Sequence, residues 1–143
     1  DLQSLRYGTP GGAKAVVQAS LHADEVPAML VAHHLRGALA QLEAQGRIRG
    51  EIVLVPYANP VGLSQRALHA HVGRFELGSG ENFNRHYPDL APRVAELVRG
   101  RLGADPAANV ALVREAARRA CAEQPADGEL ASLRRTLLQI AIY

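Results

Sequence analysis

Two apolar runs flank a stretch of helical periodicity in the first part of the chain. Lys14 to Leu21 and Ile52 to Tyr57 are continuous and rich in β-branched residues, which predicts two buried strands. Apolar residues between them recur at helical spacing and predict a helix over 25–45, with Asp24 as a candidate cap and Pro27 in the first turn. The expected apolar face comprises Ala28, Val31, Ala32, Leu35, Leu39 and Leu42. This order indicates a βαβ unit with parallel strands.

Residues 59–88 lose this periodicity, and a stretch of that length within a compact domain is typical of functional or disordered segments. Helices are then predicted over 90–102, after Asp105-Pro106, and from Asp127 onward, with Asp127 as a candidate cap. The last helix is expected to have Leu130, Leu133, Leu137 and Ile140 on one apolar face. The middle one is expected to bury Val110, Val113, Ala117 and Cys121. The pattern predicts an α/β fold with a mostly parallel or mixed sheet. Because so few strands make a poor final sheet, we expect a larger domain.

Composition narrows the class of protein. Apolar residues make up 48% and charged residues 21%, which is the globular range. No run approaches the roughly 20 apolar residues of a membrane-spanning helix, and the single cysteine, Cys121, excludes a disulfide framework. A net charge of +2 and few aromatic residues disfavour nucleic acid as a partner. No signal-peptide pattern is visible, so we expect a cytoplasmic protein without membrane partners.

His22 and Glu25 are the first candidates for chemistry, because they lie where the first strand gives way to the helix. Ligands of open α/β sheets bind at this edge. Imidazole nitrogen and carboxylate oxygen suit zinc at about 2.0–2.2 Å. Asp24, between them, is expected to point elsewhere. The alternative interpretation is that Glu25 caps the helix N-terminus and that His22 is a boundary histidine whose hydrogen bonds are satisfied.

Two further motifs carry polar side chains. The run from Asn59 to Gly62 follows the second strand and predicts a turn across the same sheet edge. Asn84 and Arg85 are adjacent donors, and the guanidinium fork of arginine matches a carboxylate. Arg74 is a second isolated guanidinium. Each arginine is equally compatible with a surface ion pair.

Taken in order, these motifs resemble the succinylglutamate desuccinylase/aspartoacylase family, zinc-dependent hydrolases related to the M14 metallocarboxypeptidases. The similarity runs from about Tyr7 to Asp89 and continues more weakly to the end. It rests on His22-x-x-Glu25, Asn59-Pro60-x-Gly62, and Asn84-Arg85 followed by Tyr87-Pro88. The resemblance implies a three-layer, zinc carboxypeptidase-like α/β fold that is incomplete in this chain. Residues 1–143 would form the N-terminal portion of a single catalytic domain that continues beyond Tyr143.

The resemblance also implies roles for individual residues. His22 and Glu25 match the first two zinc ligands, so Zn²⁺ is the expected cofactor. Asn84 and Arg85 match the pair that holds a substrate carboxylate.

Arg74 matches the arginine that polarises the scissile carbonyl, with Arg66 as the alternative. The family often has aspartate two residues before the Asn-Arg pair, where this chain has Asn82, and this departure leaves the site less negative. The third zinc ligand, a histidine, and a glutamate general base are expected beyond Tyr143. The other five histidines of the chain are not expected to bind the metal, and His71 is the first alternative ligand among them.

The function expected from the resemblance is hydrolysis of the amide bond of an N-acyl amino acid or a similar small carboxylate-bearing amide. The acyl group and the amine are left open, as is homo-oligomerisation. Two alternatives remain at this point. One is a metallocarboxypeptidase that cleaves peptides, and the other is a non-catalytic domain that binds an anion without zinc.

Overall fold

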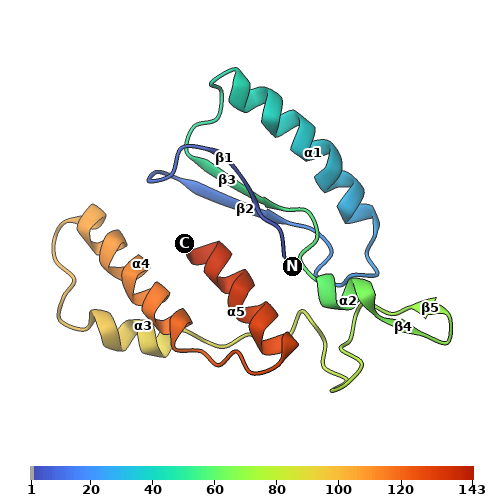
Figure 1. Ribbon diagram of the computed structural model, residues 1–143. Helices are drawn as coiled ribbons and strands as arrows, with labels where there is room; N and C mark the ends of the chain where they lie inside the picture. Colours follow the sequence, from blue (N-terminus) through green and yellow to red (C-terminus); the bar gives the residue numbers. More distant parts are fainter. Residues whose placement is uncertain (1) are drawn as a thin grey trace. The chain divides into compact units, whose positions relative to one another are not determined.

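The computed structural model describes residues 2–143 and divides the chain into two compact units, one up to Arg85 and one from His86 (Figure 1). Each unit is described by itself below. Within the described residues, no helix has the length and apolar character needed to cross a membrane.

The first unit contains a three-stranded mixed sheet. Its strands are β1 (Leu5–Gly8), β2 (Lys14–Gln18) and β3 (Glu51–Val55), in the spatial order β1-β3-β2. β2 and β3 are parallel, with Val16 opposite Val53, which confirms the predicted βαβ unit. The two predicted strands are a few residues shorter than expected. β1 pairs with β3 in the antiparallel direction and was not predicted.

Helix α1 (Pro27–Ala44) covers one face of this sheet (Figure 1). The core of the unit consists of Tyr7, Ala19, Ala32, Leu39 and Leu54. Val31, expected on the buried face, is 66% exposed. The predicted cap was wrong: the N-cap residue is Val26, which makes no side-chain cap bond. The carboxylate of Asp24 is instead directed at Arg74, with Oδ2 3.6 Å from Nε.

The segment that follows the sheet is ordered, although its sequence has no periodicity. It forms the short helix α2 (Pro60–Ser64) and a hairpin of β4 (Arg66–Ala67) and β5 (Ala70–His71). Leu68 and His69 make the turn with φ values of 49° and 65°. Residues other than glycine rarely adopt a positive φ, so the sequence did not indicate a hairpin turn here.

The second unit is helical, with α3 (Ala91–Val98), α4 (Pro106–Ala122) and α5 (Glu129–Ile142). The predicted cap before α4 is confirmed, because Asp105 accepts a hydrogen bond from the backbone of Ala107 at 2.9 Å. α3 ends earlier than the predicted helix over 90–102.

The buried face of α4 differs from the predicted one. Ala116, Ala120 and Cys121 are buried, whereas Val110 and Val113 are 49% and 39% exposed. α4 packs against both α3 and α5. Small alanine side chains allow neighbouring helices to pack closely. The face of α4 that carries the alanines is therefore buried, and the two valines remain exposed.

Helix α5 begins after Gly128, which has a φ of 85° and serves as the N-cap residue. Asp127 is therefore not the cap that the sequence suggested. The predicted apolar face is confirmed in its central part, because Leu133 and Leu137 are both buried. This pair anchors α5 within the second unit.

Candidate functional site

His22 lies in a tight turn between β2 and α1. The backbone of Ser20 adopts a φ of 54°, and its hydroxyl donates a hydrogen bond to the carbonyl of Glu25 at 3.0 Å. The amide of Glu25 in turn donates to the carbonyl of His22 at 3.0 Å. These bonds close the turn and bring both side chains to the carboxyl end of β2. His22 is only 8% exposed.

Asn59 ties the next element to this turn. Its side chain is fully buried, accepts from the amide of Gly62 at 2.8 Å, and donates to the carbonyl of Leu21 at 2.9 Å. A Cβ atom at position 62 would lie 2.5 Å from the Asn59 amide nitrogen, so the helix start requires glycine. The motif predicted as a turn therefore also fixes the residue that precedes His22.

The loop that carries Arg74 docks against the same turn. The amide of Ala23 donates to the carbonyl of Gly73 at 2.8 Å. A Cβ atom at position 73 would lie 2.7 Å from both the Ala23 side chain and the amide of Asp24. On the other side, the amide of Phe83 donates to the carbonyl of Arg74 at 3.2 Å. Close packing at Gly73 thus sets Arg74 beside the His22 turn.

Four side chains meet there. Arg74 approaches Nδ1 of His22 at 2.9 Å through NH1, and it donates to Oε1 of Glu25 at 2.8 Å through NH2. Nδ1 of His22 and Oε1 of Glu25 are 3.1 Å apart. The contacts with His22 and Arg74 lower the pKa of the Glu25 carboxyl group. Asp24 also faces Arg74, contrary to the expectation that it would point elsewhere.

Asn82 determines which nitrogen of His22 carries the proton. Its Oδ1 accepts from the backbone amide of Asn84 at 2.8 Å, so this atom is an oxygen. The same oxygen is 2.9 Å from Nε2 of His22, which must therefore be the donor. Nδ1 faces the guanidinium of Arg74, which is a donor, and the carboxylate of Glu25, which is an acceptor. Nε2 is therefore the nitrogen that donates to Asn82, and Nδ1 is the nitrogen directed at the cluster.

His22 Nδ1 and Glu25 Oε1 are placed so that both could bind one metal ion. Two ligands of a tetrahedral zinc ion, each at about 2.0–2.2 Å, lie roughly 3.3–3.6 Å apart. The 3.1 Å separation of His22 Nδ1 and Glu25 Oε1 is close to this spacing. Within residues 2–143, no group of three or more histidine, cysteine, aspartate or glutamate side chains has a metal-binding arrangement. Nε2 of His71 bonds the carbonyl of Gly62 at 3.0 Å. The described residues therefore offer two ligands.

The Asn84-Arg85 pair lies next to the cluster along the chain but does not join it. The guanidinium of Arg85 donates to the carbonyl of Asn84 at 2.7 Å, and both side chains are exposed. In the part of the chain that the structure describes, no hydrogen bond or ion pair links Arg85 to His22 or Glu25. The backbone of Asn84 is nevertheless fixed, because its amide is bonded to Asn82. Both groups remain open to solvent and to a ligand.

Of the two candidate arginines, Arg74 is the one that reaches the cluster. Arg66 is exposed on β4, where its backbone pairs with that of His71. Sequence reasoning missed two partners, the acceptor Asn82 and the carboxylate of Asp24. Asparagine side chains often accept a hydrogen bond from the backbone amide two residues later, so the Asn82–Asn84 bond could be predicted from the sequence. The contact between Asn82 and His22 could not.

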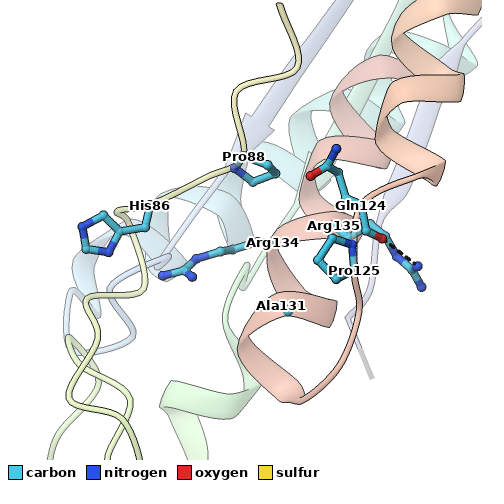
Figure 2. A pocket seen from close by; sticks show the side chains of 7 residues that line it. All are labelled: His86, Pro88, Gln124, Pro125, Ala131, Arg134 and Arg135. Carbon is cyan, nitrogen blue, oxygen red and sulfur yellow. Dashed lines mark hydrogen bonds between the residues drawn. The ribbon is translucent and has the colours of Figure 1, made fainter. Parts of the chain in front are cut away.

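A separate pocket of about 180 Å³ lies within the second unit (Figure 2). Its lining consists of His86, Pro88, Gln124, Pro125, Ala131, Arg134 and Arg135. The guanidinium of Arg135 donates to the backbone carbonyl of Gln124 at 3.4 Å. None of the site residues predicted from the sequence lines this pocket.

A family model for the succinylglutamate desuccinylase/aspartoacylase catalytic domain matches residues 11–119. The chain belongs to this family. The matched range includes the turn with His22 and Glu25, the Arg74 loop and the Asn84-Arg85 pair. A comparison with curated proteins gave no significant match.

Two solved structures resemble the chain, and both are described as belonging to the succinylglutamate desuccinylase/aspartoacylase group. The protein from Shewanella amazonensis SB2B is 27% identical over 99% of this chain, with a TM-score of 0.79. The protein from Shewanella frigidimarina NCIMB 400 is 24% identical over 96% of this chain, with a TM-score of 0.76, and shows the fold alone. The chain spans 39% and 37% of their respective lengths.

Proposed function

We propose that the protein containing this chain is a zinc-dependent deacylase that hydrolyses the amide bond of an N-acyl amino acid or a similar small carboxylate-bearing amide. The observation that carries the proposal is the convergence of His22 Nδ1 and Glu25 Oε1, 3.1 Å apart, beside the guanidinium of Arg74. Family membership supports hydrolysis as the reaction class. The proposal includes the three-layer, carboxypeptidase-like fold for the complete domain.

His22 and Glu25 would hold the metal. A bound zinc ion supplies an activated water and polarises a carbonyl oxygen. The third ligand, a histidine, and the general base, a glutamate, are proposed to lie beyond Tyr143. The orientation of His22 supports this role, because Asn82 accepts a hydrogen bond from Nε2 and thereby directs Nδ1 at the cluster. Glu25 is prepared as well, since its lowered pKa keeps it ionised.

Arg74 is proposed to stabilise the negative charge that develops on the substrate carbonyl oxygen. Its side chain is 42% exposed, so part of the guanidinium is accessible to a ligand. Asp24 faces Nε, and the two terminal nitrogens contact His22 and Glu25, so the guanidinium is held at the cluster. A donor fixed before the reaction begins costs no reorganisation during it, which makes such groups effective in the transition state.

Asn84 and Arg85 are proposed to bind the carboxylate of the substrate. The exposed guanidinium can form a bidentate, charge-assisted pair with a carboxylate. Because the backbone of Asn84 is held by Asn82, the pair is fixed relative to the turn that carries the metal ligands. Binding the substrate at this second point would orient the amide bond.

Cleavage of a peptide by a metallocarboxypeptidase is the second candidate, because exposed Arg85 would accept a peptide C-terminal carboxylate equally well. The non-catalytic anion-binding alternative is less favoured. Arg74 faces two carboxylates, those of Asp24 and Glu25, which reduce its attraction for a free anion.

The test uses the intact protein, stripped of metal with a chelator and then reloaded with zinc. Hydrolysis of N-acetyl and N-succinyl amino acids is compared with hydrolysis of N-blocked dipeptides. We expect the acyl amino acids to be cleaved only after zinc is restored, and we expect Glu25→Gln to abolish the reaction. Glu129→Gln, which removes an exposed carboxylate from the start of α5, is the matched control and should be fully active. Hydrolysis that survives complete zinc removal would refute the proposal.

A further inference from the structure

Gln65 has a buried side-chain amide whose nitrogen and oxygen both form hydrogen bonds. The residue follows α2 and is 8% exposed. Its Nε2 donates to the carbonyl of Val72 at 3.0 Å and to the carbonyl of Phe75 at 2.8 Å. Its Oε1 accepts from the amide of Leu77 at 2.9 Å. Each amide proton and the amide oxygen therefore has a partner.

These partners bracket Arg74 in the sequence. Val72 lies two residues before Arg74, and Phe75 and Leu77 lie one and three residues after it. A buried polar group whose bonds are all satisfied favours one conformation of the backbone around it. The side chain of Gln65 thus fixes the course of the loop that carries the guanidinium.

The other anchors of this loop are backbone bonds, among them an antiparallel bridge between Phe75 and Asn82 and a bond from the amide of Val72 to the carbonyl of Gln65. Gly73 is bonded to Ala23, and the carbonyl of Arg74 accepts from Phe83. Gln65 is the side chain that joins both flanks of Arg74. Loss of its donors would free the Val72 and Phe75 carbonyls to turn, and the backbone of Arg74 lies between them.

We propose that Gln65 is a positioning residue for Arg74, acting through the backbone of residues 72–77. The effect on reaction rate rests on the proposed deacylase function, but the effect on the loop does not. Gln65→Glu is the sharpest test, because it keeps the size of the side chain and the acceptor for Leu77. It removes both donors and places a carboxylate against the carbonyls of Val72 and Phe75.

In the intact protein, Gln65→Glu is expected to lower kcat by about 10–100-fold, since small displacements of a positioned group cost rates of this order. KM and zinc content should be unchanged, because the side chain of Gln65 bonds to Val72, Phe75 and Leu77 and not to Arg85 or the two proposed metal ligands. Gln41→Glu, at an exposed position of α1, makes the same chemical change and should leave kcat unaltered. If Gln65→Glu fails to fold, Gln65→Met, which is uncharged and of similar length, is measured instead.

A double-mutant cycle separates positioning from general support of the fold. If Gln65 acts through Arg74, Gln65→Glu should cost almost nothing in an Arg74→Ala background. An equal loss of kcat in both backgrounds would overturn the proposal, because it would show that Gln65 acts independently of Arg74.

Hydrogen exchange provides a readout that does not depend on activity. The amide of Phe83 is bonded to the carbonyl of Arg74, so Gln65→Glu should accelerate its exchange while the amides of α1 keep their rates. If the wild-type protein cleaves none of the amides, the proposed function fails, and faster exchange at Phe83 still supports the positioning role. Unchanged exchange at Phe83 would overturn that role whether or not the enzyme is active.

Discussion

Oδ1 of Asn82 lies 2.9 Å from Nε2 of His22 and accepts a hydrogen bond from it. Because the same oxygen also accepts from the amide of Asn84, the amide group cannot be turned around to present its nitrogen. Nε2 of the imidazole is therefore the donor toward Asn82, and Nδ1 is directed at Glu25 and Arg74. A neutral amide makes this contact at the position where the resemblance led us to expect an aspartate.

The first prediction concerns this contact. Asn82→Leu removes the acceptor and should weaken zinc binding to the intact protein by about 10–100-fold, the usual effect of losing a partner of a metal-bound histidine. Asn82→Asp keeps both accepted hydrogen bonds and adds negative charge, so it should strengthen zinc binding. Competition with a chromogenic chelator measures both affinities. Weaker binding by Asn82→Asp than by the wild type would contradict this account.

The second prediction is that Arg74 opposes metal binding while it assists the reaction. Its guanidinium contacts both proposed ligand atoms, Nδ1 of His22 and Oε1 of Glu25. Removing this cation in Arg74→Ala should raise the affinity for zinc and lower kcat by about 10²–10³-fold, as expected for loss of an oxyanion donor. Calorimetry and steady-state kinetics on the same preparation give the two values. A fall in zinc affinity would show that Arg74 supports the metal site.

The third prediction separates binding of the substrate from catalysis. Arg85→Ala should raise KM for carboxylate-bearing amides by roughly 10–100-fold, because a hydrogen bond between charged groups contributes about 1.5–3 kcal/mol. Arg114→Ala, at an exposed position of α4, removes the same charge elsewhere and is the control. An unchanged KM in Arg85→Ala would exclude Arg85 from the substrate site.

The fourth prediction concerns stability in the second unit. Arg93 donates to Glu123 through Nε at 2.7 Å and through NH2 at 3.0 Å, joining α3 to the end of α4. Arg93, and to a lesser extent Arg119, lowers the pKa of Glu123 to about 2. Since the folded-state pKa lies below the ordinary value of 4.5, this stabilisation is complete above pH 4.5 and is lost as the pH falls toward 2.

Thermal unfolding of Glu123→Gln checks this prediction. The difference in melting temperature between wild type and variant should be constant above pH 4.5 and should shrink as the pH approaches 2. Glu115→Gln is the control, because its longer contact with Arg118, at 3.5 Å, is exposed and should have little effect. A difference in melting temperature that grows toward low pH would contradict this prediction.

The parts of the fold that could be predicted from the sequence are those with local signals. The parallel pair β2–β3 and helix α1 follow from two apolar runs separated by helical periodicity. β1 escaped prediction because its four residues include Arg6 and Gly8, and only pairing with a distant strand makes them extended. The hairpin turn at Leu68 and His69 escaped because neither residue type is typical of positive φ.

The candidate site divides in the same way. His22 and Glu25 could be paired from their spacing, since a single turn brings them together. The contacts of Asn82 and Asp24 could not be predicted, because they depend on the docking of Gly73 against Ala23, a long-range contact. Local patterns contain no information about which loop meets which turn.

Zinc titration by calorimetry tests the central claim most directly, namely that His22 and Glu25 are two of the metal ligands. The intact, metal-stripped protein is measured beside the variants His22→Ala and Glu25→Gln. We predict tight one-to-one binding by the wild type and a loss of several orders of magnitude in affinity in each variant, because a catalytic zinc site has three protein ligands. Wild-type affinity in either variant would contradict the account, since the zinc ion would then be bound elsewhere.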